Sequence, residues 1–236
     1  MNRSITNALR FILDELLPPI LRDNRFLMYP LFYIWYKGKN VKKLMHFKDH
    51  IHQLSKEEFT HYYDIYDSLP TREADLSQIS LEYIVEKLAG DKMASIIDVG
   101  CGSGYLLKRL SEKGFTNLTG CDLHPPKLTP EFQHLKIDSV YLDQLPYADG
   151  QFDYVICNHV LEHVLDLEKT IAELRRITKK RLIVTVPRQR YNRFTFELHI
   201  NFFPQESYLL RSLKWTGPQE CHLLGGDWSF SGDVKN

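Results

Sequence analysis

The residues with the clearest chemical meaning are three alternate glycines, Gly100, Gly102 and Gly104, which follow the apolar segment Ile96–Val99 directly. Short β-branched residues bounded by glycine are typical of a buried parallel strand. The glycines allow backbone N–H groups to approach a ligand closely, because they carry no Cβ atom. Residues 105–110 then have the spacing of a helix. The order of strand, glycine loop and helix predicts a cradle for a nucleotide-containing ligand.

The spacing of the glycines disfavours a nicotinamide dinucleotide as that ligand. The dinucleotide fingerprint requires its third glycine three residues after the second. Tyr105 occupies that position here, and Gly104 comes one residue early. A second polar group, the carboxylate of Asp122, ends the next apolar segment about 20 residues beyond the loop, where it is placed to accept hydrogen bonds from ribose hydroxyls.

Four blocks in order resemble the class I S-adenosylmethionine-dependent methyltransferases, in their large bacterial "type 11" branch. Together the blocks cover roughly residues 92–187, and four motifs in register are more specific than one. They are the acidic residue and glycine loop of 98–104, the strand 118–123 ending in acid, the stretch 145–164 with "LPY" and "HVLEH", and the fifth strand 181–187.

The resemblance implies that S-adenosylmethionine is the cofactor and S-adenosylhomocysteine the product. It implies that Asp122 holds the ribose hydroxyls, and that Asp98 holds the loop backbone and the ammonium end of the cofactor. The adenine contact is assigned to Asp143, with Asp138 as the open alternative. The expected cofactor-binding residues are Asp98, Gly100, Cys101, Gly102, Gly104, Asp122, Leu123, Asp143 and Asn158.

The transfer of a methyl group from a sulfonium requires alignment of the acceptor and, for a hydroxyl, removal of its proton. No metal ion is expected in this chemistry. Asn158 and His159 end the fourth predicted strand, and histidine is the side chain whose ordinary pKa best suits a base at neutral pH. His199, in a stretch that resembles the start of the family's last helix, is an equal candidate. Asn158 is expected to position the acceptor, and a scaffold role for His159 stays open.

Composition limits the partners. The 236 residues are 43% hydrophobic, enough for one sizeable core and an appendage, and 30 basic residues balance 30 acidic ones. This balance disfavours a nucleic-acid partner. The four cysteines lack C-x-x-C spacing in a chain that shows no signal peptide, so we expect reduced thiols and a cytoplasmic location. They are Cys101, Cys121, Cys157 and Cys221.

Residues 1–90 are expected to form a helical cap, and residues 91–236 a three-layer α/β/α, Rossmann-like methyltransferase domain with a mostly parallel, seven-stranded sheet. In the cap, the apolar and aromatic residues 26–36 precede four lysines between positions 37 and 43. This segment is too short to span a bilayer, which needs about 20 residues. A substrate lid, a homodimer contact and peripheral membrane contact through residues 9–43 all stay open.

The sequence also predicts local features at helix ends, turns and the C-terminus. We expect Ser77 or Ser80 to cap a helix, residues 178–180 to form a turn, the closing antiparallel strands to be short, and residues 231–236 to be frayed. The predicted function is methyl transfer from S-adenosylmethionine to an oxygen, less readily a nitrogen, of a small molecule, glycan or lipid-linked intermediate. The alternative is a non-catalytic S-adenosylmethionine-binding or scaffolding protein.

Overall fold

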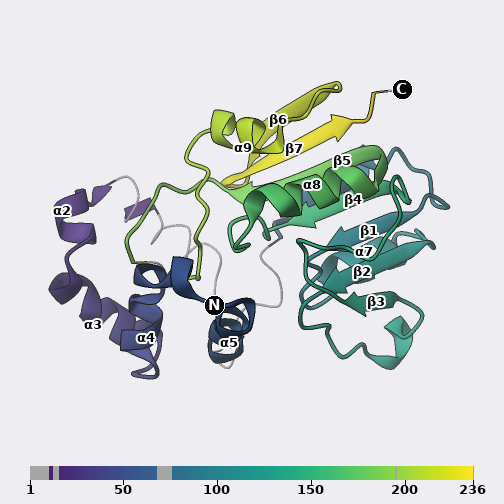
Figure 1. Ribbon diagram of the computed structural model, residues 1–236. Coiled ribbons are helices and arrows are strands. Elements are labelled where there is room, and N and C mark those ends of the chain that lie inside the picture. Colours follow the sequence, from purple (N-terminus) through teal and green to yellow (C-terminus); the bar gives the residue numbers. More distant parts are fainter. Residues whose placement is uncertain (1–10, 13–15, 68–75, 195, 236) are drawn as a thin grey trace. The chain divides into compact units, whose positions relative to one another are not determined.

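The computed structural model of the protein divides into two compact units (Figure 1). The sheet unit comprises Glu73–Arg188 and Phe203–Asn236, and the helical unit comprises Met1–Arg72 and Gln189–Phe202. The residues described by the structure are 11–12, 16–67, 76–194 and 196–235.

The sheet unit is built on seven strands in the order β3-β2-β1-β4-β5-β7-β6 (Figure 1). The first five strands in this order are parallel, and β7 pairs antiparallel with both β5 and β6. This is the mostly parallel, seven-stranded α/β fold that the sequence predicted. The strands are β1 (Ile96–Val99), β2 (Leu118–Asp122), β3 (Lys136–Ser139), β4 (Phe152–Asn158), β5 (Thr178–Pro187), β6 (Gln219–Leu224) and β7 (Asp227–Asp233).

Helices pack on both faces of the sheet, because the central strands are apolar on both sides. Val155 and Val184 point into the apolar cluster that includes the inner faces of α8 and α9, whereas Ile156 and Ile183 point into the cluster of α6 and α7. Alternating residues of a strand face opposite sides of the sheet, so strands buried on both sides read as continuous apolar runs. The helices are α6 (Gln78–Lys87), α7 (Tyr105–Glu112), α8 (Leu167–Ile177) and α9 (Glu206–Leu213), with a 3₁₀ turn, η4, at Pro130–Phe132.

The structure confirms one local expectation and corrects three others. Ser77 is the N-cap of α6, since its side chain accepts a hydrogen bond from the amide of Ser80. Residues 178–180 do not form a turn but begin β5, with a register irregularity opposite β4 between Phe152 and Tyr154. The closing strands are longer than expected, and residues 231–233 belong to β7. Strand pairing at the antiparallel end supplies hydrogen bonds that local residue preference does not reveal.

The helical unit has its own apolar core, which joins the N-terminal helices to the segment between β5 and α9. Phe32 stacks on Phe196 with the ring centroids 4.1 Å apart, and the Tyr36 hydroxyl donates a hydrogen bond to the Phe196 carbonyl. The elements of this unit are α2 (Pro19–Arg22), α3 (Arg25–Trp35), α4 (Val41–Met45), η2 (Phe47–Asp49), η3 (Ile51–Gln53) and α5 (Lys56–Asp67).

Helix α3 has apolar side chains on every side, because Met28 and Phe32 are buried while Phe26 and Ile34 are exposed. No described helix combines the length and the apolar character that crossing a membrane would require. The predicted membrane contact and homodimer contact, either of which would cover the exposed side of α3, stay predictions. The proposed division at residues 90 and 91 likewise stays a prediction.

Candidate active site

The glycine loop lies at the carboxyl ends of the parallel strands, where ligands of open α/β sheets bind. The carbonyl of Cys121 accepts hydrogen bonds from the amides of Gly100 and Cys101, at 2.7 and 3.0 Å. Gly100 has φ +77°, and a Cβ atom there would lie 2.2 Å from Val160 Cγ2. Gly102 also has positive φ, but a Cβ atom on it would meet open space. The loop is thus held by the carbonyl of Cys121 on one side, and it is open on the side to which a Cβ atom of Gly102 would point.

Asp122 and Asp98 bring two carboxylates to this loop. Asp122 Oδ2 accepts a hydrogen bond from the Gly102 amide at 2.8 Å, and its Oδ1 accepts one from the His124 amide at 3.0 Å. Asp98 is buried on β1. Burial, together with the nearby negative charge of Asp122, raises the pKa of Asp98 to about 7. Two like charges in low dielectric favour a cation as the group that binds beside them.

A row of polar side chains crosses the neighbouring strand ends. Asn158 on β4 is paired with Thr185 on β5, which is paired with Ser229 on β7. Paired residues lie on one face of the sheet. The side-chain oxygens of these three residues are buried, and within the described part of the chain none of them has a hydrogen-bond partner. Buried polar atoms are rarely left unpaired, so this row is suited to bind polar groups of a ligand or water.

His159 follows Asn158 and is held between two buried carboxylates. Its Nδ1 lies 3.2 Å from Glu162 Oε1 and its Nε2 lies 3.3 Å from Asp227 Oδ2. Carboxylate oxygens accept, so both ring nitrogens donate and the ring is an imidazolium. Burial lowers the pKa of His159, but the two carboxylates outweigh burial and raise it to about 10. An imidazolium with this pKa does not take a proton at neutral pH, which argues against the base role predicted for His159.

His199, the other predicted base, belongs to the helical unit. It is buried, with Nδ1 2.5 Å from Gln189 Oε1 and Nε2 3.7 Å from Glu197 Oε2. An amide oxygen accepts a hydrogen bond, so Nδ1 carries the proton in this pair. Its Nε2 faces the Glu197 carboxylate, and the base role of His199 stays a prediction.

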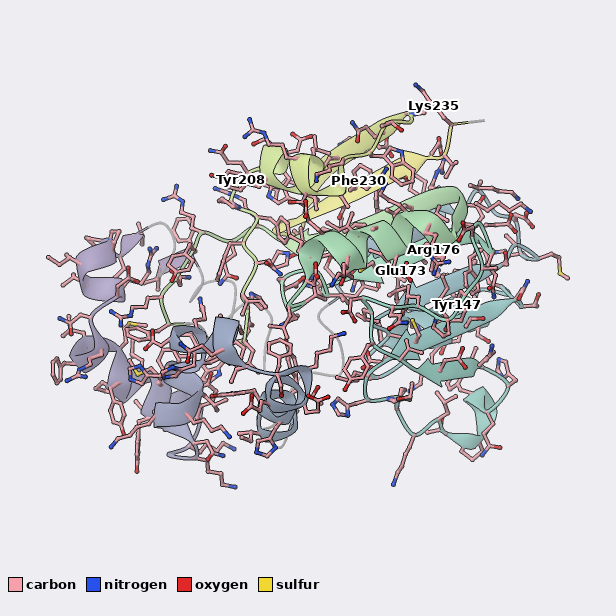
Figure 2. All side chains as sticks on the ribbon, viewed as in Figure 1. Tyr147, Glu173, Arg176, Tyr208, Phe230 and Lys235 are labelled. Atoms are coloured by element: carbon pink, nitrogen blue, oxygen red, sulfur yellow. The ribbon has the colours of Figure 1, made fainter. Side chains whose placement is uncertain are left out.

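The expected adenine side is held by a charged clamp on α8 (Figure 2). Arg176 donates hydrogen bonds to the carbonyls of Leu145 and Tyr147, at 3.0 and 2.6 Å, and Glu173 accepts one from the Leu145 amide at 2.7 Å. The Tyr147 hydroxyl in turn donates to Asp138 Oδ2 at 2.9 Å. Asp138 is thereby engaged in holding Tyr147, and Asp143 lies in the turn after β3, so the adenine contact stays a prediction for either residue.

Sequence reasoning missed the carbonyl of Cys121, the Arg176 clamp and the polar members of the strand-end row, Thr185 and Ser229. Backbone acceptors and long-range ion pairs leave no local signal in a single sequence. Thr185 did leave one, because it interrupts the apolar run 182–186 at the strand end. Leu123, another predicted contact, lies just beyond β2, and its carbonyl accepts a hydrogen bond from the Ser139 hydroxyl at 3.1 Å.

Comparison with known proteins agrees with this geometry. Residues 97–184 match the family described as "Methyltransferase domain". The ubiquinone biosynthesis O-methyltransferase of Rickettsia felis is 31% identical over 109 residues, which cover 42% of this chain and 44% of that protein. The corresponding protein of Pseudomonas aeruginosa is 31% identical over 115 residues, covering 44% and 48%. The chain thus spans less than half the length of these curated relatives.

Solved structures support the fold. A Burkholderia thailandensis 1,6-didemethyltoxoflavin-N1-methyltransferase, with bound 1,6-didemethyltoxoflavin and S-adenosylhomocysteine, superposes with a TM-score of 0.51 at 17% identity, covering 76% of this chain and 85% of that one. The complex between the Haloferax volcanii Trm112 activator and a methyltransferase gives 0.50 at 15% identity, covering 65% and 88%. The glycine loop, the strand order and the family match agree: residues 97–184 are similar to a methyltransferase domain, and the sheet unit has the class I, Rossmann-like methyltransferase fold.

Proposed function

We propose that the protein transfers a methyl group from S-adenosylmethionine to an oxygen, less readily a nitrogen, of a small molecule, glycan or lipid-linked intermediate. The observation that carries this proposal is the contact between Asp122 and the Gly102 amide, which brings an acid to the open side of the glycine loop. The O-methyltransferase activity named for the relatives supports an oxygen as acceptor. A helical cap over residues 1–90, a methyltransferase domain over 91–236 and a homodimer belong to the same proposal.

The residues at the strand ends fit the groups of this cofactor. Asp122 would accept hydrogen bonds from the ribose hydroxyls, and the unpaired Asn158 oxygen would accept from the ammonium group. The backbone of Gly100, Cys101, Gly102 and Gly104 would lie against the cofactor, with Leu123 and Asp143 on the adenine side. When bound, S-adenosylmethionine supplies a methyl group already activated by the sulfonium.

The buried charge of Asp98 also fits a cationic ligand. Since its pKa is raised to about 7, Asp98 is only partly ionised at neutral pH. A nearby ammonium group would favour the carboxylate and lower that pKa again. We therefore infer that Asp98 acts in binding the cofactor, through charge.

The proposal assigns the acceptor step mainly to alignment. Asn158 would orient the acceptor, and His199 would be the base if the acceptor is an ordinary hydroxyl. His159 would instead hold the turn after β4, since it links Glu162 to Asp227. This assignment predicts that His199→Ala lowers turnover by about 10²- to 10⁴-fold with cofactor affinity unchanged.

Titration calorimetry tests the cofactor assignment. Wild-type protein is expected to bind S-adenosylmethionine and S-adenosylhomocysteine but not NAD. Asp122→Ala should weaken both affinities by about 10- to 100-fold, because it removes hydrogen bonds to a charged acceptor. The exposed Asp91→Ala serves as the control and should change nothing. Tight binding of NAD would overturn the assignment. An affinity for S-adenosylhomocysteine that Asp122→Ala leaves unchanged would overturn it as well.

The pH dependence of affinity tests the role of Asp98. Affinity for S-adenosylmethionine should rise as the pH rises through about 7, because the carboxylate form of Asp98 attracts the cation. Asp98→Asn should abolish this dependence. Release of S-adenosylhomocysteine with hydroxyl acceptors then separates the enzyme from the alternative, a non-catalytic S-adenosylmethionine-binding or scaffolding protein.

A further inference from the structure

The outer face of α3 is a continuous apolar surface that no other described residue covers. Viewed along the helix axis, Met28 and Phe32 lie on the buried face, and Phe26, Pro30 and Ile34 lie on the opposite one. Phe26 and Ile34 are 73% and 74% exposed. A soluble helix ordinarily carries polar residues on its outer side, so this face departs from the usual pattern. The other exposed apolar residues of α3 are Leu27, Tyr29, Leu31 and Tyr33.

The apolar surface begins before α3. Leu16, just before α2, is 63% exposed. Ile20, in α2, is 80% exposed, and its neighbour Leu21 is exposed as well. Isolated exposed leucines need no explanation, but a contiguous apolar surface of this kind marks an interaction site. We define the apolar face as the exposed apolar residues between positions 16 and 34, in α2, in α3 and in the segment just before α2.

The charged residues at the start of α3 and just after it are all basic. From Arg25 to Lys48 the sequence contains six basic residues and no acidic one, although basic and acidic residues balance over the whole chain. Lys37, Lys39, Lys42 and Lys43 are exposed and follow the end of α3. Arg25, at the start of α3, is exposed and its guanidinium lies 4.7 Å from the centre of the Phe26 ring. Basic groups therefore flank α3 at both ends.

We propose that the apolar face docks the protein on a lipid bilayer that carries anionic headgroups. Apolar side chains flanked by basic ones match the acyl boundary and the negative surface of such a membrane. Tyr29 and Tyr33 have the amphipathic rings that are enriched at the headgroup level. The 11 residues of α3 are too short to cross a hydrocarbon core of about 30 Å, so the helix lies in the plane of the interface.

The charge pattern favours a bilayer over a second copy of the chain. Two copies joined through the apolar face would bring two basic clusters together, and between positions 16 and 48 each chain offers one acidic residue, Asp23, which already lies 3.5 Å from Arg22. Like charges oppose such an association, particularly at low salt. An anionic membrane turns the same charges into an attraction. This proposal does not rest on the methyltransferase activity.

Vesicle flotation of the full chain tests the proposal. Wild-type protein should float with vesicles of phosphatidylcholine and phosphatidylglycerol, more weakly with phosphatidylcholine alone, and less well as salt increases. The variant Phe26→Ser/Ile34→Ser should lose about tenfold or more in partitioning, because two large apolar side chains no longer enter the lipid. Since both residues are exposed, the variant should keep the circular dichroism spectrum of the wild type.

The sheet unit offers a matched control. Ile79 and Met93 are 53% and 74% exposed, and Ile79→Ser/Met93→Ser should float like the wild type. Lys37→Glu/Lys39→Glu should abolish the preference for phosphatidylglycerol. Failure of the wild type to float with either vesicle overturns the proposal, as does flotation that survives Phe26→Ser/Ile34→Ser. A sedimentation mass that falls from dimer to monomer in that variant, without vesicle binding by the wild type, would assign the apolar face to a second copy.

Discussion

Helix α8 in the sheet unit and helix α3 in the helical unit have the same length but differ in how completely the chain buries them. In α8, the residues facing the sheet are buried and the outer residues Glu168, Lys169 and Arg175 are polar. In α3, Phe32 is buried and the outer residues are aromatic or aliphatic. The apolar side of α8 is therefore covered within the chain, whereas α3 leaves one apolar side for another surface to cover.

The largest effect on the free energy of unfolding is expected from removing the positive charge of His159 in the sheet unit. His159→Ala removes the cation between Glu162 and Asp227 and leaves these two buried carboxylates without that positive charge. The free energy of unfolding at neutral pH should fall by about 3–5 kcal/mol. Denaturant titration followed by tryptophan fluorescence measures it. The exposed His134→Ala is the control, and an equal effect of both substitutions would contradict the prediction.

The same variant should change the pH dependence of stability. The pKa of His159 in the folded protein is raised to about 10, so its contribution is fully present below its ordinary pKa and is lost as the pH rises through about 10. The free energy of unfolding of the wild type should decline over that window, and His159→Ala should lack this decline. A pH profile of equal slope for the two proteins would show that the carboxylates do not hold an imidazolium.

A second substitution tests the buried side of α3. Phe32→Ala should lower the free energy of unfolding of the helical unit by about 3 kcal/mol, because it leaves a cavity where the ring stacks on Phe196. Hydrogen exchange of the α3 amides should increase, while the amides of β4 and β5 keep their protection. Uniform loss of protection in both units would mean that the two units unfold together.

A smaller effect is expected from the clamp on the expected adenine side. Arg176→Gln removes charge-assisted hydrogen bonds to the carbonyls of Leu145 and Tyr147, and should cost roughly 1–2 kcal/mol. The neighbouring Arg175→Gln, on the exposed side of the same helix, should be nearly neutral. Thermal denaturation compares the stability of the two variants. An equal loss of stability in both would show that the hydrogen bonds of Arg176 to the two carbonyls do not stabilise the fold.

The smallest effect should come from the exposed side of α3. Ile34→Gln is expected to change the free energy of unfolding by less than about 0.5 kcal/mol, since the side chain is already in water in the isolated chain. Denaturant titration of wild type and variant in the absence of lipid provides the measurement. A loss approaching that of Phe32→Ala would mean that the apolar face is covered within the chain, and would remove the contrast with α8.

The sequence was sufficient to predict the fold of the sheet unit because its signals are local. The apolar strand before Gly100, the acid at Asp122 and the alternation of strands with helices all follow from neighbouring residues. The start of β5 at Thr178 was not predictable in this way, because Lys179 and Lys180 are polar and their strand conformation depends on pairing within the sheet. Tertiary pairing overrides local preference at such positions.

The surroundings of His159 show why candidate site residues are harder to assign than folds. Its position at the end of a strand was readable, but its partner Asp227 lies 68 residues further along the chain. Whether a histidine is a base or an imidazolium depends on such partners. For the apolar face the opposite holds: the sequence shows that residues 26–36 are apolar, and only the structure separates the buried side from the exposed one.

The discontinuous helical unit has a consequence for how the protein is made. Tyr36 and Phe196, which are joined by a hydrogen bond, are 160 residues apart. At typical rates of synthesis, the second leaves the ribosome on the order of ten seconds after the first. Throughout that interval the buried side of α3 lacks Phe194 and Phe196, so a nascent chain would expose part of Phe32 together with Phe26. Chaperones that hold apolar segments during translation should therefore engage this protein near its N-terminus, and release it when the segment after β5 emerges.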